Sequence, residues 1–363
     1  MLQNGRRRMN VSIPTMDGVT AKTITTNRIT TRVLFTGPDD GIPVLFLHGN
    51  VSSATWWEET MVTLPAGYRG IAPDQRGFGD ADLGKKIDAT RGMGDLADDA
   101  AALLDHLGIE KAHIVGISLG GVVVWRMMRD YPERFLTVTV VNPGSPFGFG
   151  ATKDVDGTPS TPDFAGSGGG LSNPELIQRM KNGDRSMESQ VSPRMAIRFL
   201  LVKPPFIPPR EEELLSSLLS THIGAQDVPG DSAQSPNWPH MAPGVWGATN
   251  ALSPKYASDV SEIYDGRLQV PVLWVRGSHD LVVSDTAAAD PGYLGRVGLL
   301  PGWPGEETYP PQPMLGQTRA VLEKYAAAGG SYKEVVIEDA GHLAYLEKPE
   351  EFNKVFHAHL RGE

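Results

Sequence analysis

The chain has 363 residues, of which 40% are apolar and 21% are charged, and its formal net charge is −10. This length suits one large domain with a sizeable core, or one domain that carries a substantial insertion. The negative charge argues against nucleic acid and an anionic membrane surface as partners, and the absence of cysteine excludes disulfides, thiolate metal sites and a cysteine nucleophile.

The N-terminal stretch predicts a cytoplasmic protein. Residues 1–18 contain no apolar run that resembles a signal peptide. No stretch of the chain approaches the length of a transmembrane helix, so no membrane partner is expected.

The first part of the chain alternates between strand and helix patterns. Residues 19–36 are rich in Thr, Val and Ile and predict two antiparallel strands with a turn at Asn27. The short apolar run 43–47 predicts a strand that is buried on both faces of a parallel sheet. A helix around 53–64 and a strand over 68–72 complete the first cycle.

The same cycle then repeats. A helix with one apolar face is predicted over 95–107, and the strand 112–117 runs directly into Ser118. A helix over 119–129 and a buried strand over 136–141 follow. Alternation of this kind implies a parallel sheet with helices on both faces.

The alternation breaks between residues 143 and 263. This stretch holds clusters of Gly, Ser and Pro among short helical segments such as 174–182 and 211–222, and it has no clear strand pattern. We therefore expect an inserted helical cap over 143–263 that does not fold as a separate domain.

The strand pattern returns at 271–275 and 333–337, and a last amphipathic helix is predicted over 349–361. The expected fold class is α/β, with a mostly parallel sheet and helices on both faces. Residues 11–142 and 264–363 would form this core, and the cap would be inserted between them.

Residues 116–120, G-I-S-L-G, predict a nucleophile elbow with Ser118 at its centre. The strained turn between strand and helix needs almost no side chain two residues before and after the serine. A match of five residues also arises in ordinary surface loops. Here it follows a buried strand and precedes an amphipathic helix, and this context favours a nucleophile.

Nine histidines are candidates for the base that such a serine needs. His342 lies in the loop after the last predicted strand, and loops at the C-terminal ends of parallel strands surround the active-site crevice. His48 is expected to support a neighbouring loop, and His222 and His240 are expected at the surface of the cap. His106 and His113 are expected to be structural or solvated, and His279 is expected to be incidental. The last two histidines, His357 and His359, lie two residues apart on a helix, so they do not share a face and make a poor metal pair.

Asp280 is the predicted acid that orients His342 and stabilises the imidazolium. It lies just after the strand 271–275, on the same edge of the sheet. The alternative position, after the strand 136–141, is occupied by Asn142, which carries no charge.

The order of Ser118, Asp280 and His342 along the chain resembles that of the α/β-hydrolase superfamily. The resemblance runs from about residue 30 to the C-terminus, apart from the cap and one insertion. It implies the α/β-hydrolase fold and a Ser-His-Asp triad.

Two further motifs carry this resemblance. Residues 47–50, L-H-G-N, resemble the oxyanion loop of the family, which implies that the backbone N–H groups of Asn50 and Leu119 hold the oxyanion. Residues 74–79, D-Q-R-G-F-G, resemble a family loop that is usually structural.

The chain also departs from the patterns of the families that it resembles. The H-G-N triplet resembles haloalkane dehalogenases and epoxide hydrolases, but these use an aspartate where this chain has Ser118, so their chemistry does not transfer. The D-Q-R-G-F-G loop resembles prolyl iminopeptidases, whose Gly-rich H-G-G loop is absent here. Residues 285–313 look like an extra loop, and the apolar residues of this loop, including Leu299, are expected to pack on the cap. Packing of the loop on the last helix, away from Ser118, is the alternative.

The leading hypothesis is hydrolysis of a carboxylic ester or lactone through an acyl-enzyme. A cofactor-free perhydrolase or a C–C bond hydrolase with the same triad stays open, as does a non-catalytic ligand-binding or receptor-like module of the same fold. The expected partner is a small apolar ester or lactone. No cofactor and no metal are needed, and a homodimer is left open.

Aromatic residues are candidates for an apolar substrate pocket under the cap, although such residues are as much at home in a core. The cap and the loop 285–313 would together form the entrance and the acyl pocket. The candidate substrate contacts are Trp56, Trp57, Phe147 and Trp246.

Overall fold

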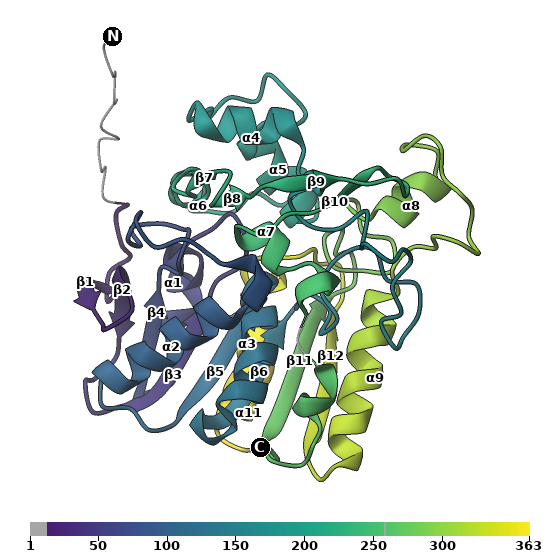
Figure 1. Ribbon diagram of the computed structural model, residues 1–363. Coiled ribbons are helices and arrows are strands. Elements are labelled where there is room, and N and C mark those ends of the chain that lie inside the picture. Colours follow the sequence, from purple (N-terminus) through teal and green to yellow (C-terminus); the bar gives the residue numbers. More distant parts are fainter. Residues whose placement is uncertain (1–12, 258) are drawn as a thin grey trace.

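Strands β1 to β6, β11 and β12 form one central sheet in the order β1-β2-β4-β3-β5-β6-β11-β12 (Figure 1). The computed structural model describes residues 13–257 and 259–363. Neighbouring strands run parallel from β4 to β12, whereas β2 pairs antiparallel with both β1 and β4. The predicted mostly parallel α/β sheet is therefore confirmed. The strands are β1 Thr20–Thr25, β2 Thr30–Thr36, β3 Ile42–Leu47, β4 Tyr68–Pro73, β5 Ala112–Ile117, β6 Phe135–Val141, β11 Pro271–Gly277 and β12 Ser331–Ile337.

Both faces of the sheet carry a hydrophobic core. Along β3, Leu45 and Leu47 belong to one core and Val44 and Phe46 to the other, because successive side chains of a strand point to opposite faces. Burial on both faces explains why this strand reads as a continuous apolar run.

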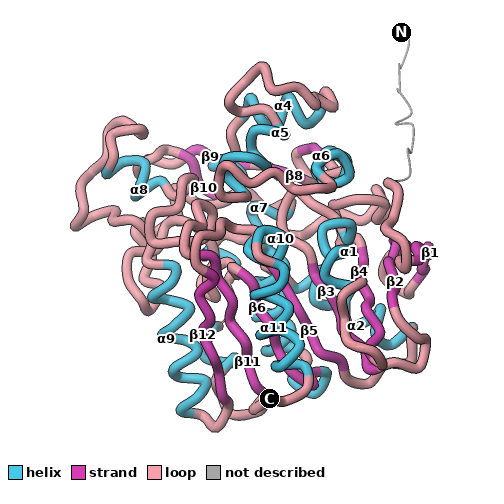
Figure 2. Tube along the Cα trace, turned by 180° about the vertical axis from the view of Figure 1, so that it is seen from behind, coloured by secondary structure: helices cyan, strands magenta, loops and turns pink. Residues whose placement is uncertain are grey.

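Helices cover these two cores from opposite sides, as Figures 1 and 2 show. The α2, α3 and α9 helices contribute to the first core, and α1, α10 and α11 contribute to the second. Their bounds are α1 Glu58–Met61 after the 3-10 turn Ala54–Trp57, α2 Gly94–His106, α3 Leu119–Asp130, α9 Met314–Ala327, α10 Ala344–Glu347 and α11 Pro349–Leu360, with further 3-10 turns at Ala89–Arg91 and Pro132–Arg134.

The segment between β6 and β11 lies above the carboxyl ends of the strands (Figure 1). It is not purely helical, so that part of the expectation is wrong. Two small two-stranded sheets, β7 with β8 and β9 with β10, lie between its helices. Each of these strands has only two or three residues. That is too short for a period of two to show in the sequence.

The elements of this segment follow one another along the chain. Its helices are η4 Gly169–Leu171, α4 Pro174–Lys181, α5 Pro193–Ala196, the π-helical turn η5 Ile197–Leu201, α6 Glu211–Leu219, α7 Ala248–Ala251, η6 Pro254–Tyr256 and η7 Val260–Ile263. Its strands are β7 Ile223–Gly224, β8 Val228–Pro229, β9 Ser232–Gln234 and β10 Met241–Pro243.

The loop 285–313, which contains α8 (Pro291–Arg296), packs on this segment. The rings of Trp238 and Tyr309 meet edge to face with centroids 4.9 Å apart. The Tyr309 hydroxyl donates a hydrogen bond to the Ala165 carbonyl at 2.8 Å. Leu299 does not take part: it is 73% exposed, so the expectation that it would be buried is wrong.

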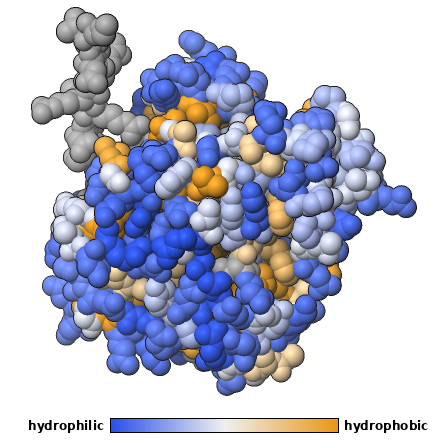
Figure 3. All heavy atoms as spheres, viewed as in Figure 1, coloured by the Kyte–Doolittle hydropathy of each residue, from blue (hydrophilic) through white to orange (hydrophobic). Residues whose placement is uncertain are grey.

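The face of the molecule in Figure 3 is mostly hydrophilic, with separate apolar patches, as the net charge would suggest. Within residues 13–257 and 259–363, no helix is long and apolar enough to span a bilayer.

His113, in β5, shows how burial alters the sheet's response to acid. Its Nδ1 lies 2.8 Å from the Thr137 hydroxyl, and its ring lies beside Tyr68. Burial, with a smaller contribution from the charge of His359, lowers the pKa of His113 to about 4.

Acidification should therefore destabilise the folded protein through His113. Because its folded-state pKa lies below the unfolded value, the neutral ring stabilises the fold above about pH 6.5, and this stabilisation is lost as the pH falls toward about 4, in total about 3 kcal/mol. The variant His113→Gln cannot titrate. From about pH 7 to about pH 4.5, the free energy of unfolding of the variant relative to wild type should rise by about 2 kcal/mol in urea titrations. If the difference in the free energy of unfolding between His113→Gln and wild type were the same at both pH values, the low pKa of His113 would be contradicted.

Candidate active site

Ser118 occupies a strained turn between β5 and α3, with φ 53° and ψ −118°. A Cβ on Gly116 would lie 2.3 Å from the Gly120 carbonyl oxygen, and a Cβ on Gly120 would lie 2.2 Å from the Leu47 carbonyl oxygen. Both flanking positions therefore require glycine. The Ser118 N–H donates to the Val141 carbonyl at 3.1 Å, which ties the turn to β6. The predicted strand, turn and helix are all present.

His342 and Asp280 form a buried pair at the same edge of the sheet. The Nδ1 of His342 lies 2.9 Å from Oδ2 of Asp280. The other oxygen, Oδ1, accepts hydrogen bonds from the N–H groups of Val282 at 2.7 Å and Val283 at 3.0 Å. A carboxylate held in this way accepts a hydrogen bond from the N–H at Nδ1, which leaves Nε2 of the imidazole free to accept a proton.

Strand register brings these loops together. Ile117 of β5 is paired with Val141 of β6, which is paired with Val275 of β11. The loops that follow β5, β6, β11 and β12 therefore leave the sheet side by side, and they carry Ser118, Asn142, Asp280 and His342.

Asn142 is a structural link that the sequence did not reveal. Its side-chain N–H₂ donates to the His342 carbonyl at 2.6 Å, and its Oδ1 accepts from the Gly277 N–H at 3.0 Å. It thus links the loop that carries His342 to the start of the loop that carries Asp280. Its φ of 39° suits asparagine better than most residues. A carboxylate at this position would face the His342 carbonyl oxygen and repel it, so the side-chain amide suits this link.

The loop after β3 lies against Ser118. A Cβ on Gly49 would be 3.2 Å from Cβ of Ser118. Among the residues that the structure describes, the backbone N–H groups of Asn50 and Leu119 donate no hydrogen bond to another group. Both are therefore available to a negatively charged oxygen near Ser118, and Leu119 opens α3, where the helix dipole adds to the attraction.

His48 supports this loop instead of titrating. Its Nε2 accepts from the Gln75 N–H at 2.9 Å, and its Nδ1 lies 2.8 Å from the Gly49 carbonyl. Burial lowers the pKa of His48 to about 4, so the ring is neutral near neutral pH. His222 is also buried, so its expected surface position is wrong, whereas His240 is exposed as expected.

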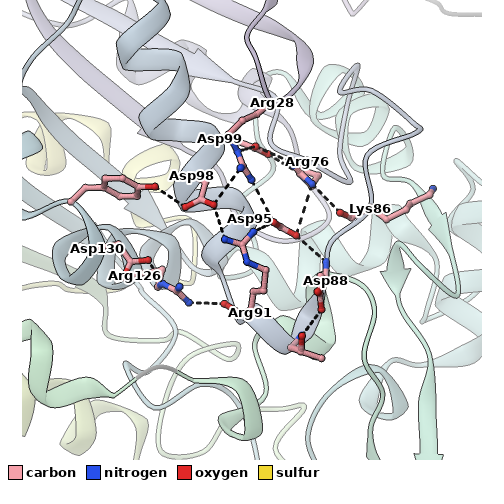
Figure 4. A network of polar contacts seen from close by, with 12 residues as sticks. Arg28, Arg76, Lys86, Asp88, Arg91, Asp95, Asp98, Asp99, Arg126 and Asp130 are labelled. Atoms are coloured by element: carbon pink, nitrogen blue, oxygen red, sulfur yellow. Dashed lines mark hydrogen bonds and ion pairs between the residues drawn. The ribbon is translucent and has the colours of Figure 1, made fainter.

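The D-Q-R-G-F-G loop is anchored by buried ion pairs. Arg32 donates to Asp74 from Nε at 2.9 Å, and Asp74 also accepts from the Ala54 N–H. Arg76 forms a two-bond pair with Asp99 of α2, both at 2.8 Å (Figure 4). The geometry suits a structural role, because buried charges are tolerated only when paired.

The predicted aromatic substrate contacts divide into two groups. Trp56 and Trp57 are buried in the second core, where Trp57 stacks on Tyr345 with centroids 4.6 Å apart. They are core residues, so the structure does not place them in a pocket. Phe147 and Trp246 are half-buried, Phe147 against the first core and Trp246 in a bridge with Asp88.

Three aliphatic residues lie where a pocket would be expected. Val51, Ile177 and Ile223 are partly buried and pack against both cores. Since the cores lie on opposite faces, and Val51 follows β3, these residues lie over the carboxyl edge of the sheet. Sequence gave no signal for them, because isolated Val and Ile residues occur in every core. Among the described residues, no cluster of three or more His, Asp or Glu could hold a metal ion.

Comparison with known proteins agrees with this architecture. A family model described as the alpha/beta hydrolase fold matches residues 42–167. The chain is 37% identical over 128 residues to the AB hydrolase superfamily protein YfhM of Bacillus subtilis, a match that covers 35% of this chain and 44% of that protein. It is 35% identical over 125 residues to the 2-hydroxy-6-oxo-6-phenylhexa-2,4-dienoate hydrolase of Burkholderia cepacia, which covers 33% of this chain and 42% of that enzyme.

Solved structures share the fold over almost the whole chain. A 2-hydroxy-6-oxo-6-phenylhexa-2,4-dienoate hydrolase from Rhodococcus superposes with a TM-score of 0.59 at 20% identity, and the match covers 94% of this chain and 99% of that one. The naproxen esterase of Bacillus subtilis gives 0.55 at 18% identity, covering 93% and 90%. The sequence matches span less than half of the curated relatives. The sheet, its strand order and these matches show that the chain has the α/β-hydrolase fold.

Proposed function

We propose that this protein is a serine hydrolase that cleaves a carboxylic ester or lactone. The observation that carries the proposal is the buried His342–Asp280 pair at the sheet edge beside the Ser118 elbow. A curated relative, the uncharacterized carboxylesterase nap of Bacillus subtilis, is 32% identical over 117 residues and supports the same class of reaction.

In the proposed mechanism, Oγ of Ser118 attacks the ester carbonyl while Nε2 of His342 takes its proton. The N–H groups of Asn50 and Leu119 would bind the oxyanion of the tetrahedral intermediate. His342 then gives the proton to the leaving alcohol, and an acyl-enzyme remains. Water repeats these steps and releases the acid, while Asp280 stabilises the imidazolium throughout.

A neutral substrate fits the charges around the triad. Recognition of a carboxylated substrate requires a cation that is not already paired. The lysines beside the His342 loop, Lys203 and Lys348, both face Asp339. Glu347 adds a further acidic group there. Val51, Ile177 and Ile223 favour an apolar acyl or alcohol group, and the segment 143–263 would act as the cap over it.

C–C bond hydrolysis is the second candidate, because the dienoate hydrolases match in both sequence and fold. The substrate in the name of those enzymes is a carboxylate, which Asp339 and Glu347 beside the His342 loop disfavour because Lys203 and Lys348 already face Asp339. Parallel assays with neutral esters, lactones and a 2-hydroxy-6-oxo dienoate would separate the two reactions. Exclusive turnover of the dienoate would overturn the ester proposal.

A fluorophosphonate probe tests whether the site is catalytic at all. We expect covalent labelling of Ser118, located by peptide mass spectrometry, because the probe reacts with a serine that an adjacent base activates. No labelling of the folded protein would favour a ligand-binding module that keeps the fold without the chemistry.

The loop 285–313 should influence which substrates are accepted. It packs on Ala151 and Trp238 of the proposed cap, and it leaves the sheet on the side of Asp280. Replacing residues 287–311 by a short Gly/Ser linker should change the chain-length preference among esters, while small activated esters still turn over. The kcat/KM values of a graded ester series check this. An unchanged profile in a folded variant would rule the loop out as a pocket wall.

A further inference from the structure

A short part of the cap segment is bonded directly to the loop that carries His342. We call residues 201–203 the strap. The Leu343 N–H donates to the Leu201 carbonyl at 3.0 Å, so the residue after His342 is fixed to the strap.

Glu347 connects the strap to the other side of His342. Its Oε1 accepts from the Gly341 N–H at 2.8 Å, and its Oε2 accepts from the Lys203 N–H at 2.8 Å. One carboxylate therefore joins the residue before His342 to the end of the strap. His342 is thus held on both sides by groups whose position depends on the strap.

The fit between strap and loop leaves no free space. A Cβ on Gly341 would lie 2.9 Å from the Lys203 nitrogen and 3.0 Å from the Val202 carbonyl carbon. Val202 and Leu343 are each only 2% exposed. The strap cannot shift away from the sheet without breaking these hydrogen bonds or pulling the loop with it.

The ionised form of Glu347 is required for both bonds. Burial raises the pKa of its carboxyl, and the N–H groups of Lys203 and Gly341 counteract this effect. An amide at this position would have one oxygen and one N–H₂ group. The N–H₂ group would then face a backbone N–H, so one of the two bonds would be replaced by a repulsive contact.

We propose that Glu347 is a positioning residue that couples the strap of the cap segment to His342. The placement of the general base then depends on how the cap is seated. This inference rests on the proposed function, because it assigns His342 the role of base. Loosening the coupling should slow proton transfer from Ser118 while leaving the substrate pocket intact.

The variant Glu347→Gln tests this coupling, and Glu350→Gln, an exposed change in the next helix, is the matched control. Hydrogen exchange by mass spectrometry should show faster exchange in residues 339–343 and 201–203 of Glu347→Gln only. In burst experiments with a short p-nitrophenyl ester, the acylation rate of Glu347→Gln should fall by up to about 100-fold, because the catalytic group is misplaced. The KM of this variant should be nearly unchanged. The pH profile of acylation should also shift.

A second variant, Val202→Ala, loosens the strap without touching the carboxylate. If both act through one coupling, their effects on the acylation rate should be less than additive in a double-mutant cycle. The proposal would be overturned if Glu347→Gln exchanged hydrogen in residues 339–343 and 201–203 as slowly as the wild type. It would also be overturned if this variant lost activity only through a higher KM. Should Glu347→Gln not fold, unchanged exchange at residues 339–343 in Val202→Ala would overturn it instead. Absence of fluorophosphonate labelling in the wild type would overturn the proposed function, whereas the exchange comparison would still test the coupling.

Discussion

Ser118→Ala is expected to lower kcat by several orders of magnitude while leaving the fold unchanged. Alanine keeps the Cβ that the turn already accommodates, so the left-handed backbone at this position carries no additional strain. What is lost is the hydroxyl that attacks the carbonyl. Turnover of an activated p-nitrophenyl ester and a urea titration would measure both effects, and the free energy of unfolding should change by less than about 0.5 kcal/mol.

The matched control is Ser284→Ala, in the partly exposed loop after Asp280. Its activity should stay within about twofold of wild type, because its hydroxyl accepts only a long hydrogen bond, from the Thr286 N–H at 3.4 Å, and does not contact Asp280. Residual activity of Ser118→Ala within about tenfold of wild type would exclude this serine as the nucleophile, since the loss of a triad serine costs far more.

Asp280→Asn is expected to lower kcat by about four orders of magnitude through the tautomer of His342. The N–H groups of Val282 and Val283 point at the Oδ1 position, so the asparagine oxygen must occupy it. The amide N–H₂ then replaces Oδ2 and faces Nδ1 of His342. Nδ1 must accept this hydrogen bond, the proton moves to Nε2, and the ring can no longer take the proton of Ser118.

Stopped-flow measurement of acylation would detect this loss, and Asp285→Asn, an exposed carboxylate nearby, is the control. Nearly wild-type acylation by Asp280→Asn would mean that another carboxylate orients the base.

The sequence by itself determined the sheet, its flanking helices and the chain order of Ser118, Asp280 and His342. These features depend on local patterns: a strand buried on both faces must be apolar throughout, and Gly116 and Gly120 have no room for a side chain. The contact between His342 and Asp280 is confirmed. The catalytic roles of these residues stay predictions.

Only the tertiary structure decided which polar and aromatic residues serve the site. Asn142 and Glu347 bond to backbone groups far away in the chain, and such bonds leave no periodic pattern in sequence. Trp57 could not be assigned from sequence, because an aromatic ring is equally suited to a pocket and to a core, and stacking on Tyr345 places it in the core. Leu299 is exposed, whereas Tyr309 and Trp303 form the contact between the loop and the cap segment. Packing between segments that are distant in the chain determines which residues fill a contact. A sequence pattern contains information only about neighbouring residues along the chain.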